Sequence, residues 1–389
     1  MRIETILAHA GLCTDETTGA VSTPIYQTAT FRHPALGVST GYDYSRTINP
    51  TRQAMERVIA ELEGGDRGFA FASGMAAITA MLMVFSSGDH MIVSDDLYGG
   101  TYRVFERIFR QFGLAVTYAD TSHSAAVLDA VIPGKTPAIF IETPTNPLMK
   151  ITDLEEIVRL ARSNGLLTIV DNTFMTPFLQ RPLEFGVDAV VHSGTKYLGG
   201  HNDLLAGTVV TRSAELSEKL GFIQNSTGAV LGPQDSWLML RGLKTLALRV
   251  ERQQENAQKI AEWLTRHDKV KEVCYPGLPA HPGHHIQQKQ SSGFGAMLSF
   301  RVPDAIWAER VINRVKLITF AESLGGVESL ITYPVRQTHG DIPVEIRDRI
   351  GVTDDLLRLS VGIEHVDDLI QDLEQALQEK TEVIRQNTE

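Results

Sequence analysis

A lysine lies between hydroxyl side chains at the end of a segment that has the pattern of a buried strand. Residues 188–207 read DAVVHSGTKYLGGHNDLLAG, which places Lys196 directly after Thr195 and close to Ser193. An aspartate, Asp171, ends an earlier apolar run, LLTIVDN. Such a combination at the ends of strands, with a lysine, a carboxylate and several hydroxyls, indicates a catalytic or binding site more strongly than any one of these residues alone.

These residue types fit a pyridoxal phosphate site. A lysine amine forms a Schiff base with an aldehyde, and a carboxylate keeps a pyridine nitrogen protonated so that the ring acts as an electron sink. After the apolar run GFAFA, Ser73-Gly74-Met75 begins a helical pattern, where glycine allows close approach and free N–H groups attract an anion. Tyr98, in SDDLYGGT, follows another predicted strand and is suited to stack on a ring.

Other motifs are less well supported. Ser193 and Lys196 match the S-x-x-K pattern of penicillin-binding proteins, but no K-T-G or S-D-N follows, and that serine should begin a helix rather than end a strand. The sequence contains neither a P-loop nor a G-x-G-x-x-G fingerprint. Taken singly, Lys196 could be a surface lysine and Asp171 a turn cap; the combined set favours the cofactor.

Three regions are expected along the chain. Residues 61–255 alternate short apolar runs with helical patterns, which predicts an α/β domain with a mostly parallel sheet. Residues 1–60 are rich in Thr, Ser, Gly and Pro and are expected to form an extended arm. Residues 256–389 are expected to form a smaller α+β domain. A long helical pattern from Ser236 to about His267 connects it to the larger domain. In open parallel sheets ligands bind at the carboxyl ends of strands, where Asp171 and Ser193 fall.

The composition excludes several classes of protein. The chain has 389 residues, is 43% hydrophobic and carries a net charge of -11, which argues against a broad nucleic-acid-binding surface. The longest uncharged run, residues 69–85, is shorter than the ~18 apolar residues that a membrane span needs, and we expect a buried strand entering a buried helix there. No secretory signal is recognisable at the amino terminus. From the charge and the short apolar runs we expect neither a nucleic acid nor a membrane as a partner.

Cysteine and histidine usage points to a reducing compartment without a metal site. The two cysteines, Cys13 and Cys274, are far apart and do not form a disulfide framework, so a cytoplasmic protein is expected. The cluster HPGHH at residues 281–285 contains Pro282 and Gly283, and we expect a surface turn rather than a metal centre.

At this point the motifs resemble a known family. VHSGTKYLGGHNDLLAG, together with STPIYQTATF, YSRTINPTR, FASGMAAI, YGGTYR, ETPTNP, VDNTF, AESLGGVESL and LRLSVGIE, resembles the Cys/Met-metabolism (transsulfuration) family of pyridoxal-phosphate-dependent enzymes over nearly the whole chain. The resemblance implies fold type I, the aspartate aminotransferase-like α/β fold, with a mostly parallel seven-stranded sheet domain and a smaller C-terminal α+β domain. It also implies small amino-acid substrates and a homo-oligomer, a dimer with shared active sites that pairs into a tetramer.

The resemblance also suggests a role for individual residues. Lys196 resembles the lysine that holds the cofactor and shuttles protons, Asp171 the pyridinium partner and Tyr98 the stacking tyrosine. The residues that resemble cofactor-binding positions are Gly74, Met75, Thr173, Ser193 and Thr195, with Tyr44 and Arg46 reaching the phosphate of the neighbouring subunit. Those that resemble substrate-binding positions are Asn146, Glu322, Ser323 and Arg358.

Within the family, the expected reaction is γ-replacement. An acidic residue at Glu322 and the sequence HNDLLAG resemble the branch of cystathionine γ-synthases and O-acetylhomoserine (thiol)-lyases, which implies joining an O-acyl-L-homoserine to L-cysteine or sulfide. Tyr333 and Arg336 depart from the better-known synthases, which leaves the acyl donor open. Cystathionine γ-lyase and cystathionine β-lyase are the alternative activities, and a catalytically silent binding protein on the same fold is the alternative of another class. The intact set of Lys196, Asp171, Tyr98 and Arg358 argues against that last alternative.

Overall fold

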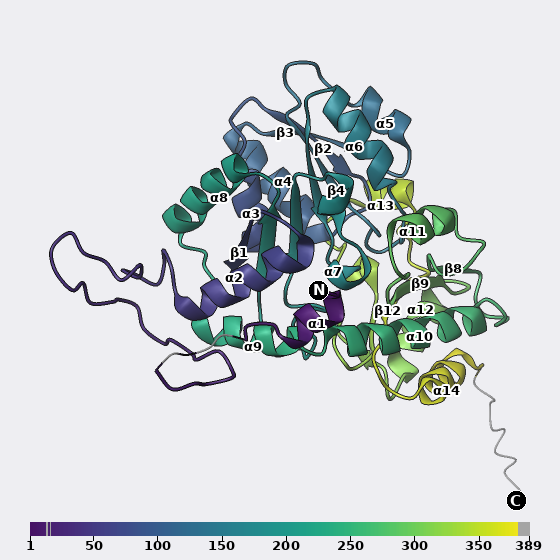
Figure 1. The fold of residues 1–389 in the computed structure, drawn as a ribbon. Coiled ribbons are helices and arrows are strands. Elements are labelled where there is room, and N and C mark those ends of the chain that lie inside the picture. The colour runs from purple at the N-terminus through teal and green to yellow at the C-terminus, as the bar shows by residue number, and fades with distance from the viewer. Residues whose placement is uncertain (13–14, 16, 380–389) are drawn as a thin grey trace, which may run out of the picture.

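A seven-stranded sheet forms the centre of the larger part of the molecule (Figure 1). The computed structural model describes residues 1–12, 15 and 17–379; Cys13 lies outside this set. The strand order is β1-β7-β6-β5-β4-β2-β3, and only β7 runs antiparallel to its neighbours, so the prediction of a mostly parallel sheet is confirmed. The strands are β1 Arg67–Phe71, β2 His90–Ser94, β3 Ala115–Ala119, β4 Ala138–Glu142, β5 Leu167–Asp171, β6 Ala189–Ser193 and β7 Gly207–Thr211.

Helices cover both faces of this sheet, which explains why most side chains of its strands are apolar. The strands β2, β4 and β7 are buried at every position, as expected of strands that face helices on both sides. One face packs against α3 (Gly74–Leu82), α4 (Gly99–Arg107) and α8 (Ala214–Thr227). The other face packs against α2 (Pro50–Glu63) and α6 (Leu154–Ser163). The expected strand and buried helix in residues 69–85 are β1 and α3.

Side-chain caps fix where the helices beside the sheet begin. Ser73 accepts a hydrogen bond from the backbone N–H of Ala76 at 3.1 Å and so starts α3 immediately after β1. Asn49 caps α2 in the same way, with Pro50 at the first helical position. Because Ser73 is the last residue before α3, the first turn of that helix lies at the carboxyl edge of the sheet.

A second, five-stranded sheet lies beside the first, in the order β10-β11-β12-β9-β8. It is covered by α10 (Leu246–Leu264), α12 (Ala305–Arg314) and α14 (Val366–Leu377), whose apolar faces join its core. The pattern VDDLIQDLEQALQEKTEVI predicts a last helix over residues 366–384, of which 380–384 lie outside the described residues. The strands are β8 Glu272–Cys274, β9 Met297–Arg301, β10 Thr319–Phe320, β11 Leu330–Thr332 and β12 Leu356–Ser360. The other helices are α1 Ile3–Ala8, α5 Ser124–Asp129, α7 Thr176–Leu179, α9 Pro233–Leu243, α11 His284–Gln290 and α13 Val344–Ile350.

The helical pattern from Ser236 to His267 forms two helices, not one. The helix α9 ends at Leu243, α10 begins at Leu246, and Thr245 between them has a non-helical backbone. At this break the guanidinium of Arg249 donates to the carbonyls of Gly242 and Tyr197, at 2.8 Å each. The prediction of a single helix was wrong because this tertiary contact stabilises a bend that the periodicity does not reveal.

The amino-terminal region is extended, with a long loop that projects from the body (Figure 1). Leu36 and Tyr44 in this loop are exposed, and an isolated bridge pairs Thr30 with Tyr44. Both α2 and α10 cross the limits that we expected near residues 60 and 255, so neither limit coincides with a break in secondary structure.

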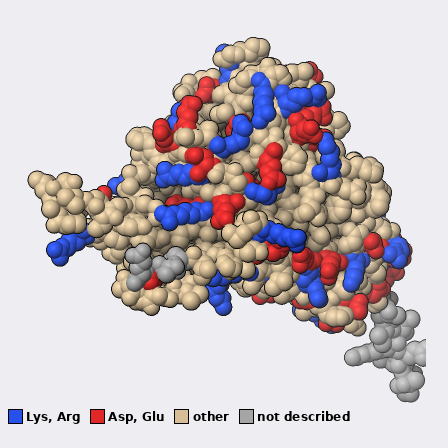
Figure 2. All heavy atoms as spheres, viewed as in Figure 1, with Lys and Arg blue, Asp and Glu red and all other residues tan. Residues whose placement is uncertain are grey.

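The charged side chains are mixed in sign on the face that Figure 2 shows. Blue and red groups alternate there without a large single-sign patch. Among the described residues, no helix is long and apolar enough to cross a membrane. No group of histidines, cysteines and carboxylates in the described part of the chain is arranged to hold a metal ion, which includes the histidines at 281–285. The expected turn ends at Gly283, because His284 begins α11. The ring nitrogen of His284 contacts the carbonyl oxygen of Pro276 instead of facing the solvent freely.

Candidate active site

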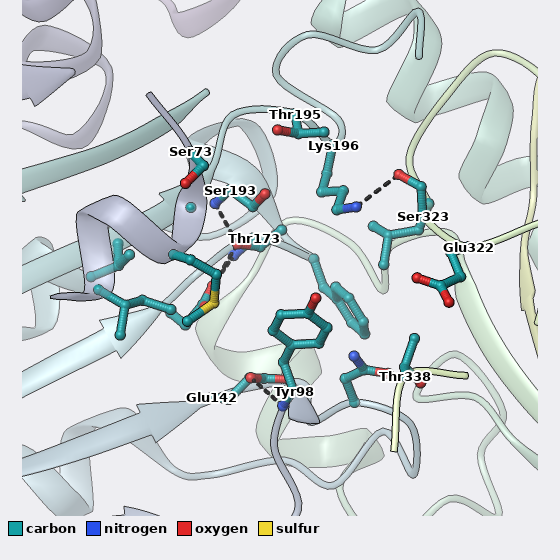
Figure 3. A pocket seen from close by; sticks show the side chains of 18 of the residues that line it. Ser73, Tyr98, Glu142, Thr173, Ser193, Thr195, Lys196, Glu322, Ser323 and Thr338 are labelled. Carbon is teal, nitrogen blue, oxygen red and sulfur yellow. Dashed lines mark hydrogen bonds between the residues drawn. The ribbon is translucent and has the colours of Figure 1, made fainter. Parts of the chain in front are cut away.

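A cavity of about 350 Å³ opens at the carboxyl edge of the large sheet, between the two sheets (Figure 3). Among its lining residues are most of those predicted from the sequence: Gly74, Met75, Tyr98, Asn146, Asp171, Thr173, Ser193, Thr195, Lys196, Glu322, Ser323 and Arg358. Tyr44 and Arg46 do not line it. The cavity therefore gathers residues from both sheets around one lysine.

Lys196 lies in the link between β6 and β7, at the centre of the cavity. Its Nζ donates a hydrogen bond to the hydroxyl of Ser323 at 2.7 Å. Burial, helped by the charge of Arg358, lowers the pKa of Lys196 to about 8, while the carboxylate of Glu322 opposes that shift. A substantial fraction of this amine is therefore neutral near physiological pH, the state that a nucleophilic lysine requires.

Asp171 ends β5 and lies across from the lysine link. Its Oδ1 accepts hydrogen bonds from the N–H and the hydroxyl of Thr173, at 3.0 and 2.5 Å. The hydroxyl oxygen of Thr173 in turn accepts a hydrogen bond from the N–H of Ser193 at 2.9 Å, so the ends of β5 and β6 are joined. Burial raises the pKa of Asp171, and the hydrogen bonds from Thr173 counteract that rise. A cationic ring nitrogen beside this buried carboxyl would favour its ionised form.

One end of the cavity is built for a small anion. The first turn of α3 meets the end of β6 so closely that a Cβ on Gly74 would lie 2.9 Å from the Cβ of Ser193. In Figure 3 the side chains of Ser73, Ser193 and Thr195 lie at this end of the cavity. Helix N–H groups and hydroxyl groups are the donors that a phosphate needs.

Tyr98 precedes α4 and faces the opposite wall. Its backbone N–H donates to Oε2 of Glu142 at 3.1 Å, and Glu142 pairs in register with Asp171 on the neighbouring strand. Burial and the nearby Asp171 raise the pKa of Glu142 well above its ordinary value, and the hydrogen bond from the Tyr98 N–H opposes that rise. Glu142 was missed by the sequence reasoning; the signal was a single carboxylate at the end of the otherwise apolar run PAIFIET.

Arg358 is buried in β12, with 1% of its surface exposed. It donates to the side-chain oxygen of Asn146 at 2.8 Å, to the hydroxyl of Thr332 at 3.0 Å and to the carbonyl of Ser323 at 3.1 Å. Its Nε has no hydrogen-bond partner within the described part of the chain, and no carboxylate there forms an ion pair with it. Burial lowers the pKa of Arg358 to about 10. A buried guanidinium with a free donor is suited to bind a carboxylate from a ligand.

Ser323 connects the lysine to the arginine. Its φ of 95° is in the left-handed region, which is unusual for a residue other than glycine. This conformation turns its hydroxyl toward Lys196 and its carbonyl toward Arg358. Glu322, immediately before it, is exposed and lines the same wall of the cavity.

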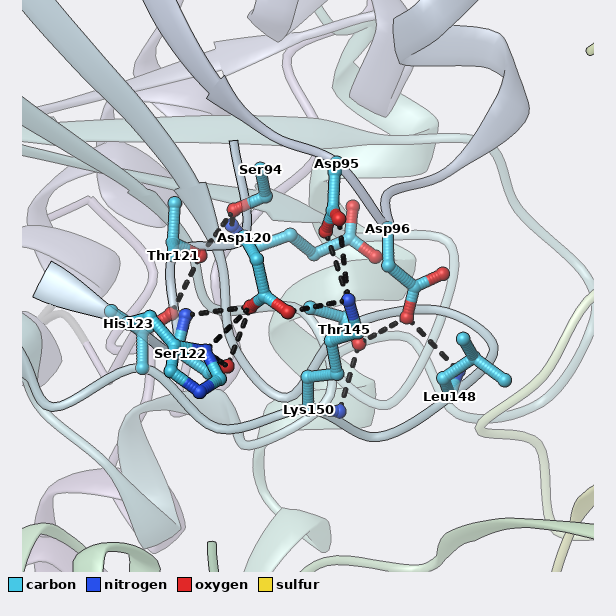
Figure 4. A network of polar contacts seen from close by, with 12 residues as sticks. Ser94, Asp95, Asp96, Asp120, Thr121, Ser122, His123, Thr145, Leu148 and Lys150 are labelled. Atoms are coloured by element: carbon cyan, nitrogen blue, oxygen red, sulfur yellow. Dashed lines mark hydrogen bonds and ion pairs between the residues drawn. The ribbon is translucent and has the colours of Figure 1, made fainter. Parts of the chain in front are cut away.

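A polar network holds the loop that carries Asn146 (Figure 4). The buried carboxylate of Asp96 accepts hydrogen bonds from the hydroxyl of Thr145 and, at 3.1 Å, from the N–H of Leu148. Lys150 bridges Asp95 and Asp120 at 3.1 and 2.9 Å. Burial raises the pKa of Asp96 to about 7. The loops after β2 and β4 are thus fixed to each other, and Tyr98 and Asn146 with them.

Tyr44 and Arg46 lie away from the cavity of their own chain. The Nη1 of Arg46 donates to the carbonyl and side-chain oxygens of Asn225, and its guanidinium lies 5.6 Å from the ring centre of Tyr44. A site that includes both residues is therefore not formed within a single chain.

Comparison with known proteins agrees with this arrangement. The model of the family described as Cys/Met metabolism PLP-dependent enzyme matches residues 4–378. The chain is 54% identical to a cystathionine γ-lyase of Bacillus subtilis, over 97% of this chain and 100% of the relative, and 53% identical to a cystathionine γ-synthase/O-acetylhomoserine (thiol)-lyase of the same organism, over 96% of each. A crystal structure of cystathionine γ-lyase from Lactobacillus plantarum has a TM-score of 0.94 and 50% identity, covering 97% of this chain and 98% of that one.

The family model matches nearly the whole chain. The names of the relatives describe enzymes that cleave or synthesise cystathionine. The fold is that of fold type I pyridoxal phosphate enzymes, and pyridoxal phosphate is the cofactor. The groups in the cavity fit it and an amino-acid substrate: a partly neutral lysine, a carboxyl, hydroxyls at a glycine-lined helix end and a guanidinium nitrogen that has no hydrogen-bond partner among the described residues. The chain is a transsulfuration enzyme that belongs to the Cys/Met metabolism family of PLP-dependent enzymes.

Proposed function

We propose that this enzyme catalyses γ-replacement, joining O-acyl-L-homoserine and L-cysteine to L-cystathionine and releasing the acyl group as a carboxylate; sulfide is a second acceptor. The observation that carries this proposal is that Glu322 and Ser323, which are adjacent in the chain, both line the cavity that contains Lys196. Ser323 holds Lys196, and the adjacent carboxylate offers a place for the ammonium of an amino-acid cosubstrate.

The residues would hold the cofactor as follows. Lys196 would bind its aldehyde carbon, Asp171 its ring nitrogen and Tyr98 one face of its ring. The phosphate would lie among Gly74, Met75, Ser193 and Thr195, with Thr173 holding Asp171 and the β6 strand end together. When bound, pyridoxal phosphate supplies an electron sink for negative charge on the substrate carbon.

The chain's own residues would then carry the substrate and its protons. Arg358 binds the α-carboxylate, and Asn146 keeps the guanidinium in place through its 2.8 Å hydrogen bond. Lys196 would take the proton from Cα and deliver it to the bound cofactor, which leaves its amine neutral again and able to take the next proton from Cβ. Among the described residues its Nζ donates only to the Ser323 hydroxyl, so the amine can move between the two carbons. The C–O bond at Cγ breaks and the acyl group leaves with its electron pair. The cysteine sulfur gives up its proton to the solvent and forms the new C–S bond at Cγ, and Lys196 would return the two substrate protons to Cβ and Cα.

Elimination from cystathionine is the second candidate function. It is favoured by the cystathionine γ-lyase of Bacillus subtilis at 54% identity, and cystathionine β-lyases of Lactococcus lactis reach 52%. The same Lys196 and Arg358 would serve these reactions, which differ in the bond that breaks.

Product analysis distinguishes these reactions. Cofactor-loaded enzyme is incubated with O-acetyl-L-homoserine and L-cysteine in one tube and with cystathionine alone in another, and the products are identified by mass spectrometry. Cystathionine in the first tube with little breakdown in the second supports the synthase. Cysteine and 2-oxobutyrate from the second tube, without synthesis, would identify a γ-lyase, and homocysteine with pyruvate a β-lyase.

We also propose that two subunits share each site, with Tyr44 and Arg46 binding the phosphate of the neighbouring subunit. Both residues are exposed in the amino-terminal region, and neither lines the cavity of its own chain. Two inactive variants, Lys196→Ala and Arg46→Ala, provide the test when they are unfolded and refolded together. A shared site predicts that mixed dimers regain one intact site and about a quarter of wild-type activity, because half of the dimers are mixed. A mixture as inactive as its components would refute the sharing.

A further inference from the structure

A buried histidine determines the hydrogen-bonding character of one residue in the cavity wall. His339 has no exposed surface, and its Nε2 lies 3.1 Å from the carbonyl oxygen of Leu97 and 3.0 Å from that of Asn146. A carbonyl oxygen only accepts, so the proton of the ring must be on Nε2. His339 thereby holds the backbone on both sides of the cavity wall, directly before Tyr98 and at Asn146.

The other ring nitrogen has no proton. Burial, together with the charge of Arg358, lowers the pKa of His339 to about 4, so the ring is neutral at physiological pH. In the neutral ring with a proton on Nε2, Nδ1 carries a lone pair. The hydroxyl oxygen of Thr338 lies 2.9 Å from this Nδ1 and therefore donates its proton to it.

Thr338 is consequently left with acceptor capacity alone. A hydroxyl has one proton and two lone pairs, and the proton is committed to His339. Thr338 lines the cavity, and Figure 3 draws it at the same end as Tyr98 and Glu322, away from Ser73 and Ser193. A ligand group that meets this oxygen has to be a hydrogen-bond donor.

The backbone around Thr338 is tightly fixed. A Cβ on Gly99 would lie only 2.0 Å from the Thr338 carbonyl oxygen, so this segment packs directly on the start of α4. Arg103 of α4 pairs with Asp341 at 2.5 Å, on the far side of His339 in the sequence. The acceptor on Thr338 is therefore held at a constant position relative to Tyr98.

We propose that Thr338 is a specificity-determining residue whose hydroxyl oxygen accepts a hydrogen bond from the distal ammonium of the substrate, with His339 as its positioning residue. The ammonium is that of L-cysteine before the C–S bond forms, or the one at the far end of cystathionine. The α-carboxylate has Arg358, and the α-nitrogen is used at the cofactor, so the distal ammonium is the donor that remains. Glu322 at the same end supplies the negative charge, and Thr338 supplies direction. This inference rests on the proposed function.

The test compares Thr338→Val with Thr338→Ser. Valine keeps the branched shape and removes the oxygen, whereas serine keeps the oxygen. Kinetics are measured for O-acetyl-L-homoserine with L-cysteine, which has the ammonium, and with sulfide, which lacks it; cystathionine cleavage is a third assay. Because a hydrogen bond to a charged group is lost, Thr338→Val should raise KM for L-cysteine or cystathionine about 10- to 100-fold and leave KM for sulfide within about twofold. Thr338→Ser should restore the wild-type values.

Each outcome has a separate meaning. Equal increases in KM for L-cysteine and sulfide would indicate a general structural role and overturn the inference, as would unchanged values for both. Unaltered cofactor absorbance and melting temperature in Thr338→Val show that the variant is folded and loaded. A wild-type enzyme that neither makes nor breaks cystathionine would refute the proposed function itself, whereas an active wild type with a normal Thr338→Val variant would refute only the role of Thr338.

Discussion

The lowered pKa of Lys196 predicts how fast the cofactor-free enzyme captures pyridoxal phosphate. Only the neutral amine attacks an aldehyde. With a pKa of about 8, about a quarter of Lys196 is neutral at pH 7.5, whereas an ordinary lysine at 10.5 would be neutral in only about one molecule in a thousand. The environment of the cavity thus increases the reactive form roughly 200-fold.

The assay follows cofactor absorbance after mixing, from pH 6.5 to pH 10, by stopped flow. The rate constant should rise with pH, reach half of its maximum near pH 8 and be constant by about pH 9.5. Nα-acetyl-lysine in the same buffers gives the reference profile, and Lys196→Ala should lack the phase. A rate that keeps rising tenfold per pH unit up to pH 10 would refute the argument, because the amine would then behave as it does in water.

Glu322 provides an internal check on the cause. Its carboxylate raises the pKa of Lys196, so Glu322→Gln should move the midpoint to lower pH. Glu328 lies in the same loop but contacts Asn202, so Glu328→Gln is the matched control and should leave the midpoint unchanged. Equal shifts in both variants would mean that general surface charge, not the Glu322 carboxylate, controls the lysine.

Three other perturbations follow from the geometry. Arg358→Lys keeps the charge but loses the planar fork, and kcat/KM should fall at least about 100-fold, measured by steady-state kinetics; a change below threefold would contradict a carboxylate clamp. Gly99→Ala should lower the melting temperature and weaken substrate binding by displacing Thr338, whereas Gly232→Ala, where an added Cβ would meet open space, is a control that should leave substrate binding unchanged. The raised pKa of Asp96 means that the folded protein keeps a proton that the unfolded chain releases between pH 4 and pH 7, so the wild type loses stability as pH rises through that window. Asp96→Asn lacks this loss. Between pH 5 and pH 8 the free energy of unfolding of Asp96→Asn relative to the wild type, measured with urea, should therefore increase by about 3 kcal/mol; the same difference at both pH values would contradict the raised pKa.

The sequence was sufficient for the large sheet and for most of the cavity. Each strand of the parallel region is a short apolar run between helical patterns, and the functional side chains follow directly after these runs, as with Asp171 and Ser193. Such features are local in sequence. The resemblance to the family added residues such as Arg358, whose apolar surroundings in LLRLSVG do not by themselves show which groups it meets.

What the sequence did not reveal depends on contacts between distant segments. Asp96 and His339 lie far from each other in the chain and were not singled out, because a lone aspartate after a strand or a lone histidine in a loop has no periodic signature. Their importance appears only when the loops that they hold meet around Asn146. The break between α9 and α10 is similar, since Arg249 stabilises it from within the following helix.

The two ends of the link that carries Lys196 are hydrogen-bonded to each other, and this bears on how the family diversifies. The N–H of Thr195 donates to the carbonyl of Ala206 at 3.2 Å, and the N–H of Ala206 donates to the hydroxyl of Thr195 at 3.0 Å, so the ends of the link are fastened together. The intervening loop includes Leu205, which is exposed and reaches the cavity. A substitution at Leu205 can therefore change the wall of the cavity while the fastened ends of the link keep the lysine in place. Such an arrangement lets natural selection reshape substrate preference while the cofactor's anchor is inherited unchanged, which suits a family whose members at about half identity bear names of different reactions.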